Sequence, residues 1–159
     1  MQSQRELALL VSDEHTPDAC FRSKIEQVLN PQKREFGCGA GKNFFGVSTG
    51  GGIYLCSAFT GMPEFRIGDV HTGLDLALQS RLEAELHVDA REPCKSCWTR
   101  YLCGGGCAYD ALLVSGSHRS PNPVACEQIR YTYELAMGMS LAIQEENPSV
   151  LETFHEAAD

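Results

Sequence analysis

The sequence has no long hydrophobic run and a shortage of basic residues. No stretch approaches the roughly 18 consecutive apolar residues that a membrane-spanning helix needs. Its 13 lysines and arginines are outnumbered by 21 aspartates and glutamates, which leaves a formal net charge of −8 at pH 7. A chain with this charge is poorly suited to nucleic acid or to an anionic membrane surface. We therefore expect neither nucleic acid nor a membrane among its partners.

Signals for secretion are also missing. The apolar stretch at residues 7–11 is short and has acidic residues on both sides, unlike a signal peptide. The sequence therefore predicts a cytoplasmic protein, and in the cytoplasm thiols stay reduced. Eight cysteines in such a chain indicate metal or cluster binding rather than a framework of disulfides.

Hydrophobic periodicity predicts a mixture of helices and short strands in a chain of 159 residues, the size of one domain. Two apolar segments, at residues 44–48 and 53–56, flank a glycine-rich turn and therefore predict a β-hairpin. A short extended piece is expected at residues 65–67. Leucines at helical spacing predict an amphipathic helix over residues 73–87. Further helices are expected at residues 18–29, 108–114, 127–146 and 149–156.

The densest chemical signal is a run of four cysteines within fourteen residues, Cys94, Cys97, Cys103 and Cys107. Cysteine thiolate is the soft ligand that holds iron–sulfur clusters and zinc. Three consecutive glycines at 104–106 separate the last two cysteines. Glycine accepts positive φ and leaves room for a cluster to approach the backbone. The run therefore predicts a loop that folds around a metal centre.

Three further cysteines share this pattern, because Cys38 and Cys56 precede the run and Cys126 follows it. Seven thiols are too many for one four-cysteine cluster, so two clusters are the economical interpretation. In bacterial ferredoxins the last cysteine of a dense run ligates the other cluster. By the same geometry, one cluster would take Cys94, Cys97, Cys103 and Cys126. The other would take Cys38, Cys56 and Cys107.

The full spacing resembles that of the SPASM domain of radical S-adenosylmethionine (SAM) enzymes. That pattern is C-x(9–15)-G-x4-C, a gap, C-x2-C-x5-C-x3-C, a gap, and C. This chain matches it with Gly51 as the glycine, and the resemblance covers residues 37–137. Residues 1–36 and 138–159 are then expected to be helical extensions. The residues around the cysteines most resemble those of maturases of ribosomal peptides and of quinohemoprotein amine dehydrogenase.

The resemblance implies a fold, two cofactors and a role. The fold would be α+β, a small β-hairpin with cluster-binding loops flanked by helices. The cofactors would be two auxiliary [4Fe–4S] clusters, with Cys38, Cys56 and Cys107 at cluster I and Cys94, Cys97, Cys103 and Cys126 at cluster II. The role would be to anchor a peptide or protein substrate and to transfer electrons. A separate radical SAM barrel chain would be the partner.

The sequence departs from the family pattern in three places. Sulfatase-maturing members have another cysteine between the first two ligands, and none lies between Cys38 and Cys56. Cluster I would therefore have an open iron, available to a substrate thiolate, or would be completed by Cys20. Ser57 stands where those members carry an aspartate base. The C-x3-C-x2-C motif that binds the SAM-cleaving cluster is absent, so we expect no SAM site and no catalysis by the chain alone.

Two other functions remain open at this stage. A stand-alone iron–sulfur electron-transfer protein is the second alternative. Zinc also binds C-x2-C pairs, so a structural zinc-binding interaction module is the third alternative. Only one such pair is present, whereas zinc ribbons commonly need two.

Overall fold

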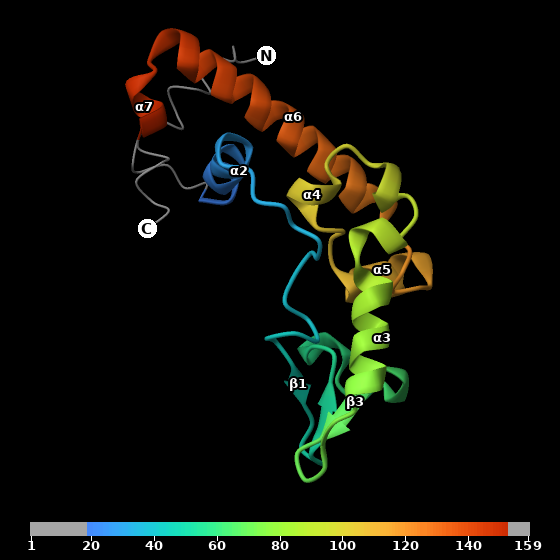
Figure 1. The fold of residues 1–159 in the computed structure, drawn as a ribbon. Coiled ribbons are helices and arrows are strands. Elements are labelled where there is room, and N and C mark those ends of the chain that lie inside the picture. The colour runs from blue at the N-terminus through green and yellow to red at the C-terminus, as the bar shows by residue number, and fades with distance from the viewer. Residues whose placement is uncertain (1–18, 153–159) are drawn as a thin grey trace. The chain divides into compact units, whose positions relative to one another are not determined.

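In a computed structural model of the protein, residues 19–152 are described, and the chain divides into two compact units (Figure 1). The central unit comprises residues 34–125. The terminal unit comprises residues up to 33 together with those from 126 onward. The fold is α+β, as the sequence predicts. The expected division into residues 1–36, 37–137 and 138–159 stays a prediction.

The central unit contains a small antiparallel sheet with its strands in chain order. The strands are β1 (Gly46–Val47), β2 (Gly52–Tyr54), β3 (Arg66–Asp69) and β4 (Gly73–Leu74). The predicted hairpin is confirmed as β1 and β2, which pair with Val47 opposite Ile53. Its turn closes where the N–H of Gly51 donates to the carbonyl of Ser48 at 3.0 Å, with Gly51 at φ 85°. Positive φ at this place is why the turn needs glycine.

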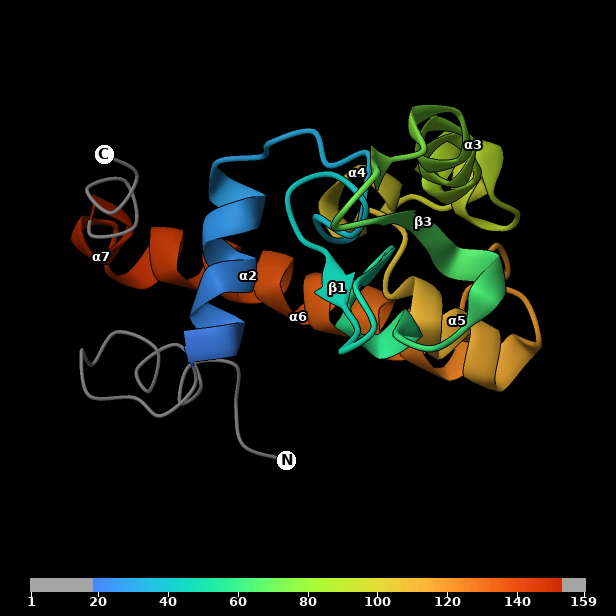
Figure 2. The same cartoon turned by 90° about the horizontal axis from the view of Figure 1, so that it is seen from below.

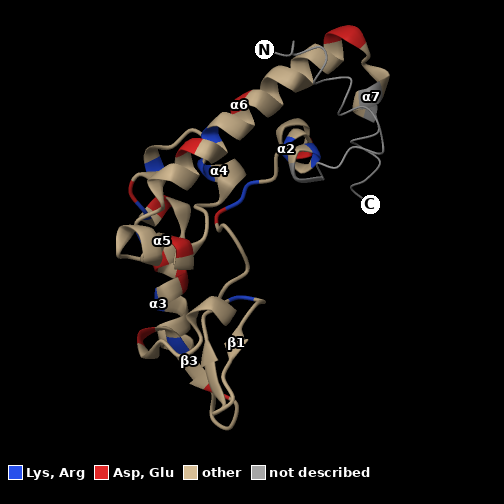
Figure 3. Cartoon of the chain, turned by 180° about the vertical axis from the view of Figure 1, so that it is seen from behind, with Lys and Arg blue, Asp and Glu red and all other residues tan. Residues whose placement is uncertain are grey.

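Charge is absent from the β1–β2 hairpin. No Lys, Arg, Asp or Glu occurs between Lys42 and Glu64, and Figure 3 shows these two strands without charged residues. Phe44 and Val47 are nevertheless exposed, at 51% and 57% of their surface. The hairpin therefore presents an apolar surface to its surroundings.

The turn from β3 to β4 is held by Asp69. Its carboxylate accepts a hydrogen bond from the backbone N–H of His71 at 3.0 Å and one from Arg66 Nη2 at 2.6 Å. The bond from His71 and the positive charge of Arg66 lower the pKa of the Asp69 carboxyl. Asp69 thus remains ionised and serves the turn, which agrees with a structural role better than with acid–base chemistry.

Helix α3 (Leu76–Leu86) follows the sheet and begins later than the sequence predicts. The expected start was residue 73, but Gly73 and Leu74 pair with β3 as strand β4. Asp75 ends the strand and caps the helix, because its side chain accepts a hydrogen bond from the N–H of Leu78 at 3.0 Å. Such a cap satisfies a backbone donor that the first helical turn leaves without a partner.

The core of the central unit lies between the sheet and α3. Phe59, Phe65 and Ile67 are buried there, with the rings of Phe59 and Phe65 4.0 Å apart. Leu82 and Leu86 of α3 join this core, and Leu74 and Leu78 pack against it. The leucine repeat is thus confirmed as a core-facing stripe.

Two shorter helices flank the glycines 104–106 in the central unit. They are α4 (Arg100–Cys103) and α5 (Ala108–Ser115). Helix α5 confirms the helix predicted over residues 108–114. The Glu92–Pro93 peptide bond just before the cysteine run is cis.

The terminal unit is formed by α2 (Ala19–Leu29) and α6 (Pro123–Glu146), with α7 (Ser149–Glu152) after them. Ile25 of α2 packs against Ala136 and Met139 of α6, and Figure 2 shows the two helices crossing. Tyr133 is fully buried, and its hydroxyl donates to Gln27 Oε1 at 2.5 Å. The expected helical character of residues 1–36 holds for α2 but not for residues 30–36, which are irregular. Predicted helix residues 18 and 153–156 lie outside the described part.

Helix α6 also begins earlier than predicted. The expected start was residue 127, after Cys126, whereas Cys126 lies within the first turns of the helix. Asn122 is the reason, because its side-chain oxygen accepts hydrogen bonds from the N–H groups of Val124 and Ala125 at 3.0 and 3.4 Å. Proline at the first helical position is also favourable, since its missing N–H has no partner to lose there. Within residues 19–152, no helix combines the length and the apolar character needed to cross a membrane.

Candidate metal centre

The first part of the cysteine run is folded into consecutive turns. Cys94 begins a 3-10 turn, and the N–H of Cys97 donates to the carbonyl of Cys94 at 2.9 Å. The N–H of Cys103 donates to the carbonyl of Thr99 at 2.8 Å. Cys94 is buried, while Cys97 and Cys103 are half-buried. Three of the four predicted ligands of cluster II thus belong to one tightly turned segment.

Thr99 is a contact of this segment that sequence reasoning missed. The residue is 2% exposed, and its hydroxyl lies 3.2 Å from the sulfur of Cys97. A hydroxyl at this distance is able to donate to a thiolate. Hydrogen bonds to ligand sulfur are one of the means by which proteins tune cluster potentials. The position of Thr99, two residues after a predicted ligand, was the available signal.

Positive φ at three consecutive glycines turns the chain between Cys103 and Cys107. Gly104, Gly105 and Gly106 have φ values of 73°, 91° and 71°. The glycine loop, as we call residues 104–106, ends α4 and leads to Cys107, which precedes the first residue of α5. A side chain at these φ values would be strained, so this loop needs glycine. The glycines predicted to fold the run are confirmed in that role.

The glycine loop is in direct backbone contact with the segment that carries Cys38. A Cβ atom added to Gly37 would lie 2.1 Å from the carbonyl oxygen of Gly106, and one added to Gly104 would lie 2.2 Å from the carbonyl oxygen of Phe36. Cys38 and Cys107 each follow one partner of the first contact. Both thiols are exposed. Two of the three predicted ligands of cluster I are therefore carried by segments whose backbones touch.

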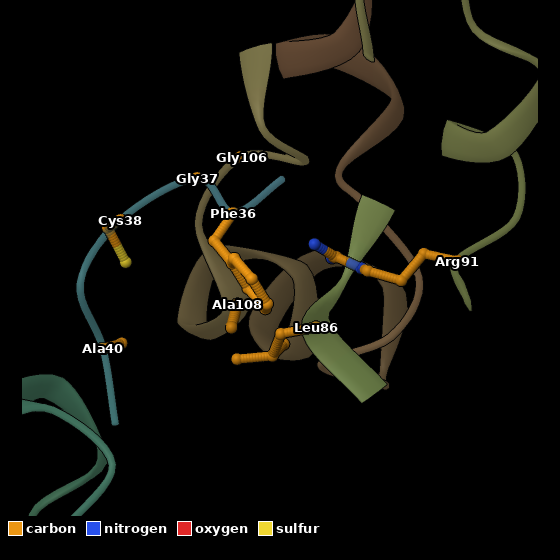
Figure 4. Close-up of a pocket in the computed structure, with 8 residues that line it drawn as sticks. All are labelled: Phe36, Gly37, Cys38, Ala40, Leu86, Arg91, Gly106 and Ala108. Carbon is orange, nitrogen blue, oxygen red and sulfur yellow. The ribbon is translucent and has the colours of Figure 1, made fainter. Parts of the chain in front are cut away.

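A small pocket lies beside this contact (Figure 4). Cys38 lines one side of it and the side chain of Arg91 reaches in from the other side. The remaining lining residues are mainly small or apolar. They are Phe36, Gly37, Ala40, Leu86, Gly106 and Ala108.

The hairpin returns Cys56 to the same region of the chain. The N–H of Gly41, three residues after Cys38, donates to the carbonyl of Leu55 at 2.8 Å. Cys56 is the next residue, half-buried, and packs against the core. The hairpin thus brings the segment of Cys56 back beside the segment that carries Cys38.

The two other cysteines lie outside the central unit. Cys126 is half-buried and belongs to the part of α6 that lies in the terminal unit, so it is described apart from Cys94, Cys97 and Cys103. Cys20 lies in α2, and its side chain is outside the described part of the structure. Its suggested role as a ligand of cluster I stays a prediction.

The cysteines do not form a ready-made ligand set. Among the side chains that the structure describes, no three of the His, Cys, Asp and Glu type are gathered closely enough to hold a metal ion. The fit to a cluster rests instead on chemistry and backbone: soft thiol donors, a glycine loop and two exposed thiols at one backbone contact. Ligand sets commonly reach their final geometry only when the metal binds. The donor chemistry of these residues is that of a cluster site, and cluster binding itself stays a prediction.

Polar residues near the site have structural partners. Asp110 accepts a hydrogen bond from the side-chain amide of Asn122 at 2.9 Å. The ring of Tyr109 stands edge-on to Phe59, with centroids 5.4 Å apart. His118 Nε2 lies 2.7 Å from a carboxylate oxygen of Glu85. These contacts give the three residues a structural role through packing and hydrogen bonding.

Comparison with known proteins shows a partial similarity to an archaeal protein. No known family profile matches the chain. Over 92 residues, 57% of its length, the chain is 35% identical to an uncharacterized protein of Archaeoglobus fulgidus. The aligned part is 22% of that protein. The chain thus spans about a fifth of the relative that it matches, which is a considerably longer protein.

Proposed function

We propose that the chain is the auxiliary-cluster part of a radical SAM peptide-modifying system of the cytoplasm, built like a SPASM domain. It would hold two [4Fe–4S] clusters, anchor a peptide or protein substrate, and transfer electrons. The observation that carries the proposal is the sevenfold cysteine spacing, together with the backbone contact between Gly37 and Gly106. That contact joins segments that are 69 residues apart in the sequence and end at two of the predicted ligands.

The support for the predicted ligands differs between cluster I and cluster II. For cluster I, the contact at Gly37 and the hydrogen bond from Gly41 to Leu55 support the grouping of Cys38, Cys107 and Cys56. For cluster II, the turns of the 94–103 segment support Cys94, Cys97 and Cys103. Cys126 is assigned to cluster II by the sequence pattern.

When bound, the clusters would supply one-electron transfer and, at an open iron, a site for a soft ligand. The chain's own residues would bind and orient the substrate. The uncharged β1–β2 hairpin, with Phe44 and Val47 exposed, offers an apolar surface on which a peptide could dock. No C-x3-C-x2-C motif is present in the sequence, so SAM cleavage would need a radical SAM barrel on another chain.

The relative from Archaeoglobus fulgidus is consistent with a module that works beside other domains. Its similarity to this chain is confined to about a fifth of its length. A SPASM-like domain attached to a catalytic barrel would produce such a partial match. We propose the same relationship between this chain and its barrel partner.

Metal content after anaerobic purification tests the proposal directly. The protein is reconstituted with iron and sulfide, and iron, acid-labile sulfide and zinc are measured per chain alongside the EPR spectrum. We expect about eight irons and eight sulfides, the content of two cubane clusters. Zinc without labile sulfide that persists through reconstitution would overturn the proposal in favour of the structural zinc module. Reversible redox activity without any effect of a barrel partner would favour the stand-alone electron-transfer protein.

Single cysteine variants then test the two ligand sets. Cys107→Ser should remove cluster I and leave about four irons, and Cys126→Ser should do the same for cluster II. Cys20→Ser is the matched control, because Cys20 lies outside the sevenfold pattern. Full iron content in the Cys107→Ser protein would contradict the assignment of cluster I. A loss of iron in the Cys20→Ser protein would show that Cys20 completes a ligand set.

A further inference from the structure

Arg91 is the largest fully buried side chain of the described residues, with 2% of its surface exposed. It lies three residues before Cys94, in the central unit. A guanidinium cannot give up its proton in a protein, so the residue carries its charge into the interior. Burying a charge is unfavourable unless hydrogen bonds compensate for lost hydration. The groups that contact Arg91 therefore indicate which part of the structure its buried charge stabilises.

Three hydrogen bonds of the guanidinium go to backbone carbonyls. Nη1 donates to Gly105 at 2.7 Å, Nη2 donates to His118 at 3.0 Å, and Nε donates to Arg119 at 3.2 Å. The first acceptor is the middle residue of the glycine loop, and the other two lie in the loop after α5. The planar guanidinium fixes the relative directions of its donors. Arg91 thus ties the backbone between Cys103 and Cys107 to a second loop.

The glycine loop and Arg91 also fit each other sterically. A Cβ atom added to Gly105 would lie 2.9 Å from Arg91 Nη1, closer than real Cβ atoms approach other heavy atoms. The guanidinium therefore occupies the space that a side chain at residue 105 would need. A side chain at residue 105 would therefore displace the guanidinium from its present position.

Arg91 also lines the pocket that contains Cys38. Figure 4 shows its guanidinium end within this pocket, whose lining includes Gly106 of the glycine loop. The positive charge is thus placed next to segments that carry two predicted ligands of cluster I. Net charge near a cluster is one of the determinants of its reduction potential.

We propose that Arg91 is a positioning residue of the metal centre. It holds the glycine loop in the conformation that sets the backbone between Cys103 and Cys107. Its charge raises the reduction potential of the cluster bound through Cys38, Cys56 and Cys107, because a nearby positive charge favours the added electron. The inference rests on the proposed function for the potential, whereas the loop-holding part concerns the protein without metal.

The first test measures thiol reactivity in the metal-free protein. Wild type, Arg91→Met and Arg91→Lys are treated with iodoacetamide, and the alkylation rate of each cysteine is followed by mass spectrometry of its peptide. Loss of charged hydrogen bonds should release the loop and accelerate alkylation of the half-buried Cys103 by about tenfold in Arg91→Met. Cys56, also half-buried but on another segment, is the internal reference. Arg81→Met, at an exposed arginine of α3, is the matched control variant.

The outcomes separate a positioning role from general support of the fold. Acceleration at Cys103 with an unchanged rate at Cys56 supports the proposal. Equal acceleration at both cysteines would mean that the whole unit loosens and would overturn it, as would no change at Cys103. If Arg91→Met does not fold, Gly105→Ala displaces the guanidinium instead, with Gly116→Ala as control. Gly116 has a φ of 72° and open space around it, so its substitution adds the same strain without the collision.

The second test measures reduction potentials after reconstitution. Arg91→Met should lower the potential assigned to cluster I, whereas Arg91→Lys, which retains the charge, should largely preserve it. An unchanged potential in a fully loaded Arg91→Met protein would refute the electrostatic part while leaving the proposed function intact. A wild-type protein that takes up no iron would refute the proposed function, and the alkylation test would still decide the loop-holding part.

Discussion

Replacing Gly37 with alanine tests the backbone contact on which the proposed cluster I depends. The added methyl group would lie 2.1 Å from the carbonyl oxygen of Gly106, whereas ordinary contact begins at 3.4 Å. The two segments would therefore have to separate by the difference, about 1.3 Å. Neither partner is the movable end of a side chain, so rotation cannot relieve the overlap.

The expected losses of stability and of bound iron follow from this overlap. Forcing an extra carbon into a closely packed region costs about 1–3 kcal/mol. In a chain of 159 residues, each kcal/mol lowers the midpoint of thermal unfolding by roughly 2–4 °C. We expect the metal-free Gly37→Ala protein to melt at least roughly 2 °C below wild type. After reconstitution its iron content should fall from about eight to about four per chain, because only the segments of cluster I are pushed apart.

Gly50→Ala provides the matched control for this experiment. Gly50 lies in the exposed hairpin turn, without positive φ, and an added Cβ meets no heavy atom within 4 Å. Its variant should melt and load iron like wild type. A Gly37→Ala protein that matches Gly50→Ala in melting temperature and iron content would refute the contact between the Cys38 segment and the glycine loop.

Three further predictions concern other parts of the chain. Trp98, the only tryptophan and 48% exposed, directly follows Cys97, so cluster incorporation should quench its fluorescence; unchanged emission in a loaded protein would contradict cluster II at this run. Because the pKa of Asp69 is lowered from its ordinary value of 3.8, its carboxylate contributes stability above that pH, and this is lost as the pH falls through the folded-state value. Urea unfolding should show Asp69→Asn less stable than wild type at pH 6 and the difference vanishing in acid; a difference that is constant with pH would exclude the carboxylate as its cause. Tyr133→Phe removes the hydroxyl bonded to Gln27 and should lower the free energy of unfolding by about 1–3 kcal/mol, with wild-type stability as the contrary result.

The sequence predicts the elements whose signals are local. The glycine turn between apolar segments identifies the β1–β2 hairpin, and the leucine spacing identifies the buried face of α3. The predicted starts of α3 and α6 were less accurate. Asp75 and Asn122 set these starts through side-chain caps, which hydrophobic periodicity does not reveal. Strand β4 was missed for a related reason. Its two residues form a strand only because β3 lies beside them.

The candidate site also combines features that the sequence predicts with features that it does not. The cysteine spacing identifies the predicted ligands, and the three consecutive glycines identify the glycine loop. Both signals can be read directly from the sequence pattern. The contact between Gly37 and Gly106 has no such signature, because it arises from the return of a distant segment. Arg91 was likewise missed, since nothing in its neighbours distinguishes a buried arginine from an exposed one.

The hydrophobic core of the central unit has a consequence for the order in which the protein is assembled. Phe59, Phe65 and Ile67 are buried against α3, and the contacts among them need no metal. Small zinc domains, in contrast, gain their folding energy from the ion and are unfolded without it. We therefore expect the central unit to fold without metal, so that the proposed clusters would enter a protein that is already folded. Their loading would then be governed by access to the exposed thiols of Cys38 and Cys107.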